Sequence, residues 1–448
     1  MSTTPYDLAI LGAGAAGMMA ALRASALGLR VAVFDPFWSQ PNNLLLSGGL
    51  FPAAGSRLQA DAGVADSPEV WLEDLRQFAG TSCNERIAAS VAEVLPTVVE
   101  SLLQAGVPVR FLADVPAPGH RTVRFHSVTP ASGAALHASL REALGRCAGL
   151  QCHPDTGISR IDRGDGRFTL QHAGGLSHAR HLLLAGGGFG AAPEMVAEFI
   201  PEMAGALHSG APSQDGSTIA LARAWGAALG GMDGYQGQGH THPDGRTRLG
   251  MSIPTLGGIM LNRAGQRFVR EDVGPSALAA KVLGQPGQQA LEVFDAAIEQ
   301  RLGNHSAYAA ARAAGRVMEA DDLEALARQA QVPLAALRES VQLAQRCAQG
   351  EANDPLGRTH FEQPLQAPFR ASWVTGSLAH TQGGLLTDGD GRVLDAGDRP
   401  MAGVYAAGGC AAGLSGHGGD GYLPGNGLAQ SFGLALRAVE HLAETSRR

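Results

Sequence analysis

The chain has 448 residues and 61 glycines, and 45% of it is hydrophobic, which suits two domains or one large α/β domain with an insertion. The formal net charge is −7 and no basic run occurs, which excludes nucleic acid as an expected partner. We expect no integral membrane segment because no stretch of about 18 apolar residues occurs, and five cysteines without metal spacing predict reduced thiols in a cytoplasmic protein.

The N-terminus has the pattern of a βαβ unit that binds a dinucleotide. An apolar strand over 6–11 leads into the Gly-Ala-Gly-Ala-Ala-Gly turn at 12–17, a helix, and a second strand over 31–35. The three glycines permit a tight turn, close approach to a pyrophosphate, and close packing of helix on strand. Asp35 follows about 20 residues on, where a ribose hydroxyl needs an acceptor. This motif alone leaves NAD and FAD open.

The next 150 residues alternate between helical and strand patterns. Residues 151–184 have the turns of a β-meander, and the apolar strand 181–185 runs into the glycine-rich segment 186–190. A buried strand followed by glycines is a second place where backbone approaches a ligand. Terminal proline and glycine signals predict helices. The ranges are 68–80, 84–106 and 133–149.

The character of the chain changes between about 200 and 368. A hairpin is expected over 257–268. Alanine-rich segments predict helices over 289–301, 306–314, 320–331 and 333–348. We interpret 201–368 as an inserted domain and assign 1–200 and 369–448 to the domain that binds the cofactor.

The last 80 residues carry three further motifs. They are His-Thr-Gln-Gly-Gly-Leu at 380–385, Gly-Val-Tyr-Ala-Ala-Gly-Gly at 403–409, and Tyr-Leu-Pro-Gly-Asn-Gly-Leu-Ala-Gln-Ser-Phe-Gly at 422–433. Together with the N-terminal turn, this set resembles the flavoprotein family of fumarate reductase, succinate dehydrogenase and 3-ketosteroid dehydrogenases. The similar stretches extend over nearly the whole chain.

The resemblance implies an α/β fold: a Rossmann-like FAD-binding domain of the glutathione reductase type, with an inserted α+β capping domain that helps to form the substrate site. It implies FAD, held noncovalently because 42–49 contain no histidine. For the adenosine half it implies Gly12, Gly14, Gly17 and Asp35, and for the flavin Ser47, Gly48, Gly49, Gly408, Asn426, Gly427 and Leu428. Further expected cofactor contacts are Ala15, Ala16, Pro36, Ile158, Ala185, Gly186, Gly187, Asp215 and Gly409.

Two departures from the family bear on the substrate. Tyr422 stands where fumarate reductases have an arginine that binds a substrate carboxylate. Pro275 falls about where those enzymes have a proton-donor arginine, although Arg270 lies nearby. Both dicarboxylate signatures are missing, so we do not expect fumarate or succinate as the substrate.

The resemblance also implies catalytic roles. Tyr422 resembles the tyrosine with which ketosteroid dehydrogenases polarise a ketone oxygen, and the alternative is a tyrosine packed beside the cofactor. His380 matches the histidine that contacts a substrate carbonyl or carboxylate oxygen, and the alternative is a structural bond to backbone. Glu271 matches a family glutamate in proton delivery, and the alternative is an ion pair with Arg267 or Arg270.

The base that removes the α-proton has two candidates in one glycine-rich loop. Tyr235 needs a lowered pKa to act near neutral pH, whereas His240 does not. His240 and His242 alternate, but no carboxylate or cysteine cluster completes a metal site, so we predict no metal. A polar surface loop is the alternative for both.

These features predict an FAD-dependent dehydrogenase that desaturates the bond α,β to a ketone of a small cyclic compound, such as an oxocyclohexanecarboxylate, or of a ketosteroid. The rivals are an enoate reductase of the fumarate or urocanate type, a hydratase in which flavin is structural, and a flavin-binding interaction module without turnover. An external electron acceptor or donor is expected, because no second dinucleotide motif and no iron–sulfur cysteine spacing occur.

Overall fold

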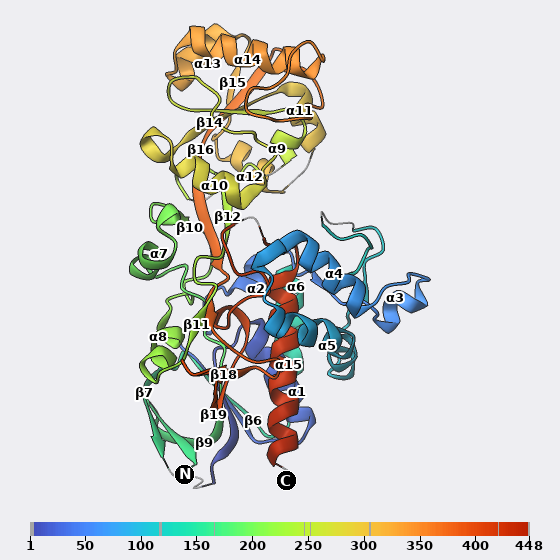
Figure 1. The fold of residues 1–448 in the computed structure, drawn as a ribbon, viewed down its shortest axis with the longest axis vertical. Helices are drawn as coiled ribbons and strands as arrows, with labels where there is room; N and C mark the ends of the chain where they lie inside the picture. The colour runs from blue at the N-terminus through green and yellow to red at the C-terminus, as the bar shows by residue number, and fades with distance from the viewer. Residues whose placement is uncertain are drawn as a thin grey trace. The chain divides into compact units, whose positions relative to one another are not determined.

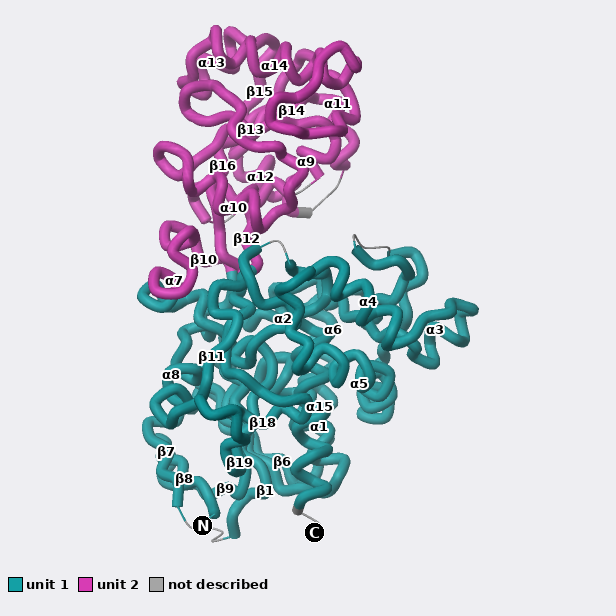
Figure 2. The backbone as a smooth tube through the Cα atoms, in the orientation of Figure 1, with its two compact units in different colours: residues 1–195, 210–235, 380–448 teal, residues 196–209, 236–379 magenta. Residues whose placement is uncertain are grey.

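The computed structural model describes residues 4–115, 119–164, 166–245, 247–250, 252–303, 306–419 and 421–446. The chain divides into two compact units, each assembled from separate segments (Figure 2). Unit 1 comprises residues 1–195, 210–235 and 380–448, and unit 2 comprises residues 196–209 and 236–379. The domain boundaries proposed from the sequence, with 201–368 as the insertion, stay a prediction.

A mostly parallel sheet organises unit 1 (Figure 1). Its strand order is β18–β19–β9–β1–β2–β6, in which β18 is an antiparallel edge strand and the other five run parallel. The bounds are β1 Tyr6–Leu11, β2 Val31–Asp35, β6 Leu150–Pro154, β9 Gly175–Leu184, β18 Arg392–Leu394 and β19 Pro400–Ala406. The side chains of β2 are buried along its whole length, as expected for a parallel strand covered on both faces. The predicted α/β class is confirmed.

The β-meander predicted after residue 150 is also present. β9 pairs antiparallel with β8, and β8 pairs antiparallel with β7, so the three strands form an antiparallel meander attached to the sheet through β9. β7 spans Ile158–Gly164 and β8 spans Arg167–His172. β6 precedes them but joins β2 in the parallel sheet.

Helices α1, α5, α6 and α15 pack together within unit 1. The predicted helices 68–80, 84–106 and 133–149 are confirmed as α4, α5 and α6, with α6 ending four residues early. The bounds are α1 Ala15–Ala26, α2 Asn43–Leu46, α3 Arg57–Asp61, α4 Pro68–Ala79, α5 Glu85–Gln104, α6 Gly133–Gly145, α8 Ser217–Ala224 and α15 Asn426–Ser446. Two small sheets join β3 Phe51–Pro52, β5 Phe125–Ser127 and β4 Arg110–Phe111, and β11 Leu229–Gly230 with β17 Gly384–Leu385.

Helix α5 is the one helix of the described residues that is long and apolar enough to cross a membrane, judged by length and composition alone. Half of its apolar window is buried inside the protein. It packs against α4 and α15, and it contains Pro96. These contacts are those of a core helix in unit 1.

Unit 2 is an α+β structure around the long strand β16, Phe369–Thr381, whose last two residues belong to unit 1. β10, β12, β14 and β15 pair with β16, and β13 pairs with β14. The bounds are β10 Leu207–His208, β12 Tyr235–Thr241, β13 Ile259–Leu261, β14 Ala290–Asp295, β15 Met318–Ala320, α7 Pro193–Phe199, α9 Ser252–Thr255, α10 Pro275–Leu283, α11 Ala296–Leu302, α12 Ser306–Ala313, α13 Leu323–Ala330 and α14 Leu334–Ala348. Apolar side chains of these strands and helices form its core, among them Leu261, Leu291, Phe294 and Leu337.

The prediction of a helix over 289–301 is wrong in its first half. Residues Ala290–Asp295 form β14, which lies between β13 and β16 with every side chain buried. Strand pairing on both edges outweighs the helix propensity of the neighbouring alanines. The predicted 257–268 hairpin is present as a turn at Asn262–Gln266, but the strand partner of β13 is β14.

Candidate functional site

The carboxyl ends of four neighbouring parallel strands define the candidate cofactor site of unit 1. β19, β9, β1 and β2 lie side by side and point the same way, so their last residues share one edge of the sheet. In open α/β sheets, ligands bind outside this edge. The segments that follow these strands contain most of the predicted cofactor residues.

The glycine turn after β1 packs tightly on one side and is open on the other. Gly12 has φ +110°, and a Cβ there would lie 2.3 Å from the carbonyl oxygen of Ala185. A Cβ at Gly17 would lie 1.9 Å from the carbonyl oxygen of Gly12. Apart from its chain neighbours, no atom of the described residues lies within 4 Å of a Cβ built at Gly14, which caps α1 without a side-chain hydrogen bond. The amides of Ala15 and Ala16 therefore begin a helix N-terminus with room for a pyrophosphate.

The carboxylate of Asp35 is almost fully buried at the end of β2. It accepts hydrogen bonds from the backbone amides of Ala13 and Phe37, each at 2.7 Å. Burial raises its pKa, while the two amides act in the opposite direction. A carboxylate has more acceptor positions than these two bonds use, so Asp35 keeps acceptor positions for the ribose hydroxyl that the sequence predicts there. Pro36 comes next in the chain, and the backbone amide of Thr156 binds the carbonyl of Asp35, which brings the start of β7 at Ile158 to the same place.

The predicted flavin segment after α2 is fastened to the start of α6. The hydroxyl of Ser47 donates to the carbonyl of Leu44 and accepts from the amide of Gly49. The carbonyl of Ser47 accepts from the amide of Gly133 at 3.0 Å. A Cβ at Gly49 would lie 2.5 Å from the backbone of Ser132. The segment containing Gly48 is thus held by backbone contacts on both sides.

The glycines after β9 and β19 approach the same turn. A Cβ at Gly408 would lie 3.0 Å from the Cβ of Ala16, and a Cβ at Gly409 would lie 2.9 Å from the amide of Gly188. A Cβ at Gly186 would lie 2.0 Å from the hydroxyl of Thr218 in α8. These contacts bring together the segments of Ala185, Gly186, Gly187, Gly408 and Gly409. Asp215 is exposed and accepts from the amide of Ser217 beside α8.

The start of α15 has a buried side chain that fits a bound cofactor. Asn426 is 1% exposed, and within the described part of the chain neither its amide nitrogen nor its amide oxygen has a hydrogen-bond partner. A buried amide is normally paired, so the Asn426 side chain is available to pair with a bound molecule. Gly427 and Leu428 follow in the first turn, where backbone amides favour negative charge such as that of a reduced flavin.

Two predicted catalytic side chains meet beside Gly427. The rings of His380 and Tyr422 lie 5.3 Å apart at 71°, and the Tyr422 hydroxyl accepts from the Gly427 amide at 3.4 Å. A Cβ at Gly427 would lie 3.4 Å from the Tyr422 oxygen and 3.9 Å from Nε2 of His380. Burial raises the pKa of Tyr422 and lowers the pKa of His380, so both groups are neutral near pH 7. Both side chains are therefore uncharged groups that can form hydrogen bonds.

Tyr235 lies close to this pair along the backbone. Its amide donates to the carbonyl of Gly418, four residues before Tyr422. The carbonyl of the preceding Gly234 accepts from the amide of Gln382, two residues after His380. The Tyr235 side chain is 1% exposed. The structure thus brings Tyr235 into the same unit as His380 and Tyr422.

His240 and Glu271 are buried in unit 2. Nδ1 of His240 lies 2.9 Å from Oε1 of Glu292. The carboxylate of Glu271 accepts four hydrogen bonds. Two come from the guanidinium of Arg267, one from Arg358, and one from the backbone amide of Met260. All of its acceptor positions are therefore in use, which favours the structural alternative for Glu271 over proton delivery.

Sequence reasoning missed two groups that support the Tyr422 region. Gln382 is 5% exposed and contacts the ring of His380. It lies in the His-Thr-Gln-Gly-Gly-Leu motif at 380–385, but no role is predicted for it from the sequence. Arg124 is fully buried between Asp66 and Asp74, and it donates to His120, which in turn binds the carbonyl of Pro424. A lone arginine in the sequence gives no signal for such a network.

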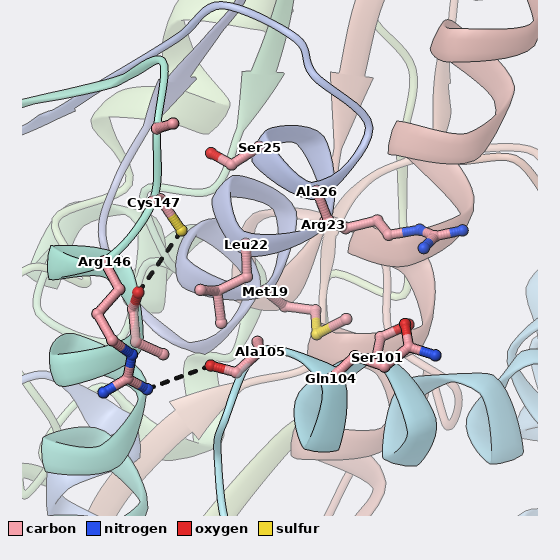
Figure 3. Close-up of a pocket in the computed structure, with 12 residues that line it drawn as sticks. Met19, Leu22, Arg23, Ser25, Ala26, Ser101, Gln104, Ala105, Arg146 and Cys147 are labelled. Carbon is pink, nitrogen blue, oxygen red and sulfur yellow. Dashed lines mark hydrogen bonds between the residues drawn. The ribbon is translucent and has the colours of Figure 1, made fainter.

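A cavity of about 360 Å³ lies elsewhere in unit 1, among residues of α1, α5 and α6 (Figure 3). The α1 residues that line it, Met19 to Ala26, form the end of that helix farthest from the glycine turn. In it, Arg146 donates to the carbonyl of Ala105, and the thiol of Cys147 donates to the carbonyl of Ala143. The cavity is therefore separate from the candidate cofactor edge. Among the residues that the structure describes, no group of three or more His, Cys, Asp or Glu side chains could hold a metal.

Comparison with known proteins agrees with this geometry. The model of the FAD binding domain family matches residues 7–428. A probable fumarate reductase of Shewanella frigidimarina is 26% identical over 97% of this chain and 74% of its own length.

Two solved structures share the fold. The open conformation of a flavocytochrome c3 fumarate reductase has a TM-score of 0.86 at 24% identity, covering 100% of this chain and 79% of the other. A 3-ketosteroid Δ1-dehydrogenase from Sterolibacterium denitrificans has a TM-score of 0.81 at 22% identity, covering 99% and 100%. The chain belongs to the FAD binding domain family, and it is an FAD-dependent oxidoreductase that acts on carbon–carbon bonds.

Proposed function

We propose that the protein is an FAD-dependent dehydrogenase that desaturates the bond α,β to a ketone, either of a small cyclic ketone or of a ketosteroid. The convergence of Tyr422 and His380 on one point beside Gly427 carries this proposal. Two neutral groups suit a ketone oxygen, whereas a carboxylate is commonly bound by arginine in a bidentate pair.

The proposed roles follow from these groups. Hydrogen bonds from Tyr422 and His380 to the ketone oxygen stabilise the enolate that forms when the α-proton leaves. Tyr235, held between the segments of Gln382 and Gly418, is the proposed base. FAD, when bound, supplies the acceptor for the hydride that leaves the β-carbon. We propose His240 as a base only in second place, because its ring is buried against Glu292 in unit 2.

The state of Arg270 supports a ketone over a dicarboxylate. Its guanidinium makes two hydrogen bonds to Asp272, at 2.7 and 3.0 Å, so its charge is already paired. Pro275 occupies the first position of α10 and has no side chain that could donate a proton. Neither residue therefore offers an unpaired guanidinium for a substrate carboxylate.

The second candidate is an enoate reductase, which would run the same chemistry in the opposite direction. It is favoured by the fumarate reductase relative, which is more similar in sequence than the ketosteroid dehydrogenase structure. Both candidates need an external electron partner. We also propose that FAD is bound noncovalently and that the protein works in the cytoplasm, in keeping with its five free thiols.

The deciding experiment is an anaerobic titration of the FAD-loaded protein with cyclic ketones and ketosteroids, followed by flavin absorbance. Bleaching by a saturated ketone is the expected result. Silence toward every ketone, with reoxidation of the dithionite-reduced protein by fumarate or another enoate, would replace the proposal by the second candidate. Turnover without any change in flavin absorbance would indicate a hydratase.

A further inference from the structure

The imidazole of His380 has a polar partner on the side away from Gly427. The amide nitrogen of Gln382 lies 3.0 Å from Nδ1 of His380. An amide NH₂ group only donates, so Nδ1 accepts this bond and carries no proton. The carbonyl of Thr381 lies at 3.4 Å from the same atom and would require a proton there. The shorter contact therefore assigns the proton to Nε2.

The side chain of Gln382 is itself held in place. Its backbone amide donates to Gly234 and its carbonyl accepts from Gly413, each at 2.7 Å. A Cβ at Gly413 would lie 2.6 Å from Oε1 of Gln382, and a Cβ at Gly234 would lie 2.9 Å from its Cβ. Backbone on two sides thus encloses the Gln382 side chain, and both glycines make room for it.

The Tyr422 hydroxyl is oriented in a comparable way. Its oxygen accepts from the Gly427 amide, so its hydrogen is directed away from that amide and is available to donate. Nε2 of His380 and the Tyr422 oxygen both lie within 4 Å of the position that a Cβ on Gly427 would take. Two N–H or O–H donors can therefore meet one oxygen there.

We propose that Gln382 is a positioning residue that holds His380 as the neutral Nε2–H tautomer, so that His380 donates beside Tyr422 to a single substrate oxygen. The tautomer follows from the contact alone, whereas the donor role rests on the proposed ketone chemistry. In this arrangement His380 binds the oxygen and does not act as the base.

The first test reads the tautomer without any substrate. Nitrogen-15 NMR of the FAD-loaded protein distinguishes protonated from unprotonated ring nitrogens, and the His380→Gln variant identifies the His380 signals among the 15 histidines. We expect a proton on Nε2 and none on Nδ1. A proton on Nδ1 at neutral pH would overturn the proposal.

Two variants test whether Gln382 causes this state. Gln382→Glu introduces a side chain that only accepts, so we expect the proton to move to Nδ1 and the His380 ionisation to enter the pH profile of kcat/KM at higher pH. Gln382→Met removes the donor, and we expect mixed tautomers and a loss of about tenfold in kcat/KM. An unchanged tautomer and pH profile in Gln382→Glu would overturn the role of Gln382.

A control separates this role from general loss of a side-chain amide. Gln345 is partly buried in unit 2, and its side-chain amide donates to the carbonyl of Leu365 at 2.6 Å. Gln345→Met should leave the His380 signals unchanged even if it lowers Tm. If the tautomer is found as expected but no ketone bleaches the flavin, the proposed function fails and the role of Gln382 stands.

Discussion

The hydroxyl of Tyr422 is the atom on which the proposed chemistry most depends. In the protein it accepts one long bond, from Gly427 at 3.4 Å, so its removal costs little stability. The Tyr422→Phe variant should still bind FAD and unfold at a similar Tm. A ketone should reduce its flavin about 10²- to 10³-fold more slowly, which is the usual effect of losing one oxyanion donor. Stopped-flow absorbance measures the rate. A variant that reduces at the wild-type rate would show that Tyr422 only packs beside the cofactor.

Glu271 offers a test between a structural and a catalytic side chain. Its carboxylate neutralises the buried guanidinium groups of Arg267 and Arg358. Asp354 is the other carboxylate beside these groups, so Glu271→Gln leaves one of the two positive charges uncompensated and should cost about 3–5 kcal/mol of unfolding free energy. Denaturant unfolding measures this loss, while the rate per folded, flavin-loaded molecule should be retained.

The exposed pair of Arg301 and Glu362 provides the matched control for Glu271. Glu362→Gln should leave the unfolding free energy nearly unchanged, because solvent screens such exposed pairs. Full stability of Glu271→Gln together with a collapsed rate would restore the proton-delivery role.

At the scale of elements, the sequence predicted those parts whose signals are local. The β1–turn–α1–β2 unit was predicted because its glycines, apolar strands and Asp35 stand in a fixed order over 30 residues. α4 was predicted from Ser67 and Pro68, and the Ser67 hydroxyl does cap the helix through the amide of Val70. The edge where these strands end could be placed as well, because parallel strands share it.

β14 shows what local signals cannot predict. Its six residues read as part of an alanine-rich helix, and only pairing with β13 and β16 makes them a strand. Glu292 lies in this strand, and its contact with His240 depends on the strand pairing, so it could not be predicted from the sequence. The contact of His120 with Pro424 joins residues 304 positions apart, and no local sequence pattern predicts a contact over that separation.

Two glycines of the turn before and at the start of α1, Gly14 and Gly17, should respond differently to an added side chain. One substitution should affect cofactor binding and the other the stability of the fold. At Gly14 a Cβ meets no atom of the described residues beyond its chain neighbours within 4 Å, so Gly14→Ala should fold with unchanged Tm as apoprotein. The methyl group would occupy the space of the pyrophosphate, so the Kd of FAD should rise at least tenfold. At Gly17 a Cβ lies 1.9 Å from the Gly12 carbonyl, so Gly17→Ala should destabilise the apoprotein itself.

Calorimetry of both apoproteins and fluorescence titration with FAD make this comparison. Equal FAD affinity in Gly14→Ala and wild type would mean that the pyrophosphate does not approach this turn. An unchanged Tm in Gly17→Ala would contradict the close packing of α1 on β1.

Across the whole molecule, each unit contains its own buried ionic network. Unit 1 encloses Arg124 between Asp66 and Asp74, and unit 2 encloses Arg267 and Arg358 with Glu271 and Asp354. In unit 1 the network continues through His120 to the turn before α15, and so it supports the segment that carries Tyr422. Buried charge of this kind requires fixed partners, so the loss of one partner costs far more stability than the loss of an exposed ion pair.

His126 supplies the clearest pH dependence. Its ring is fully buried in β5, where Nδ1–H donates to the carbonyl of Arg124 and Nε2 accepts from the Ser56 hydroxyl. Burial lowers its pKa from 6.5 to about 4. Below pH 6.5 His126 is therefore protonated in the unfolded chain, whereas in the folded protein it stays neutral until about pH 4. Its contribution to stability, about 3 kcal/mol at most, is present above pH 6.5 and is lost as pH falls toward 4.

Urea unfolding between pH 7.5 and 4.5 measures this loss. The unfolding free energy of the wild type should decrease as pH falls, and His120, His153 and His181, whose pKa values burial also lowers, contribute with the same sign. His126→Gln cannot titrate and should give a less steep decrease, although its stability at pH 7.5 is lower. If the two curves are parallel, the pKa of His126 is the same in the folded and the unfolded protein, and burial in β5 does not lower it.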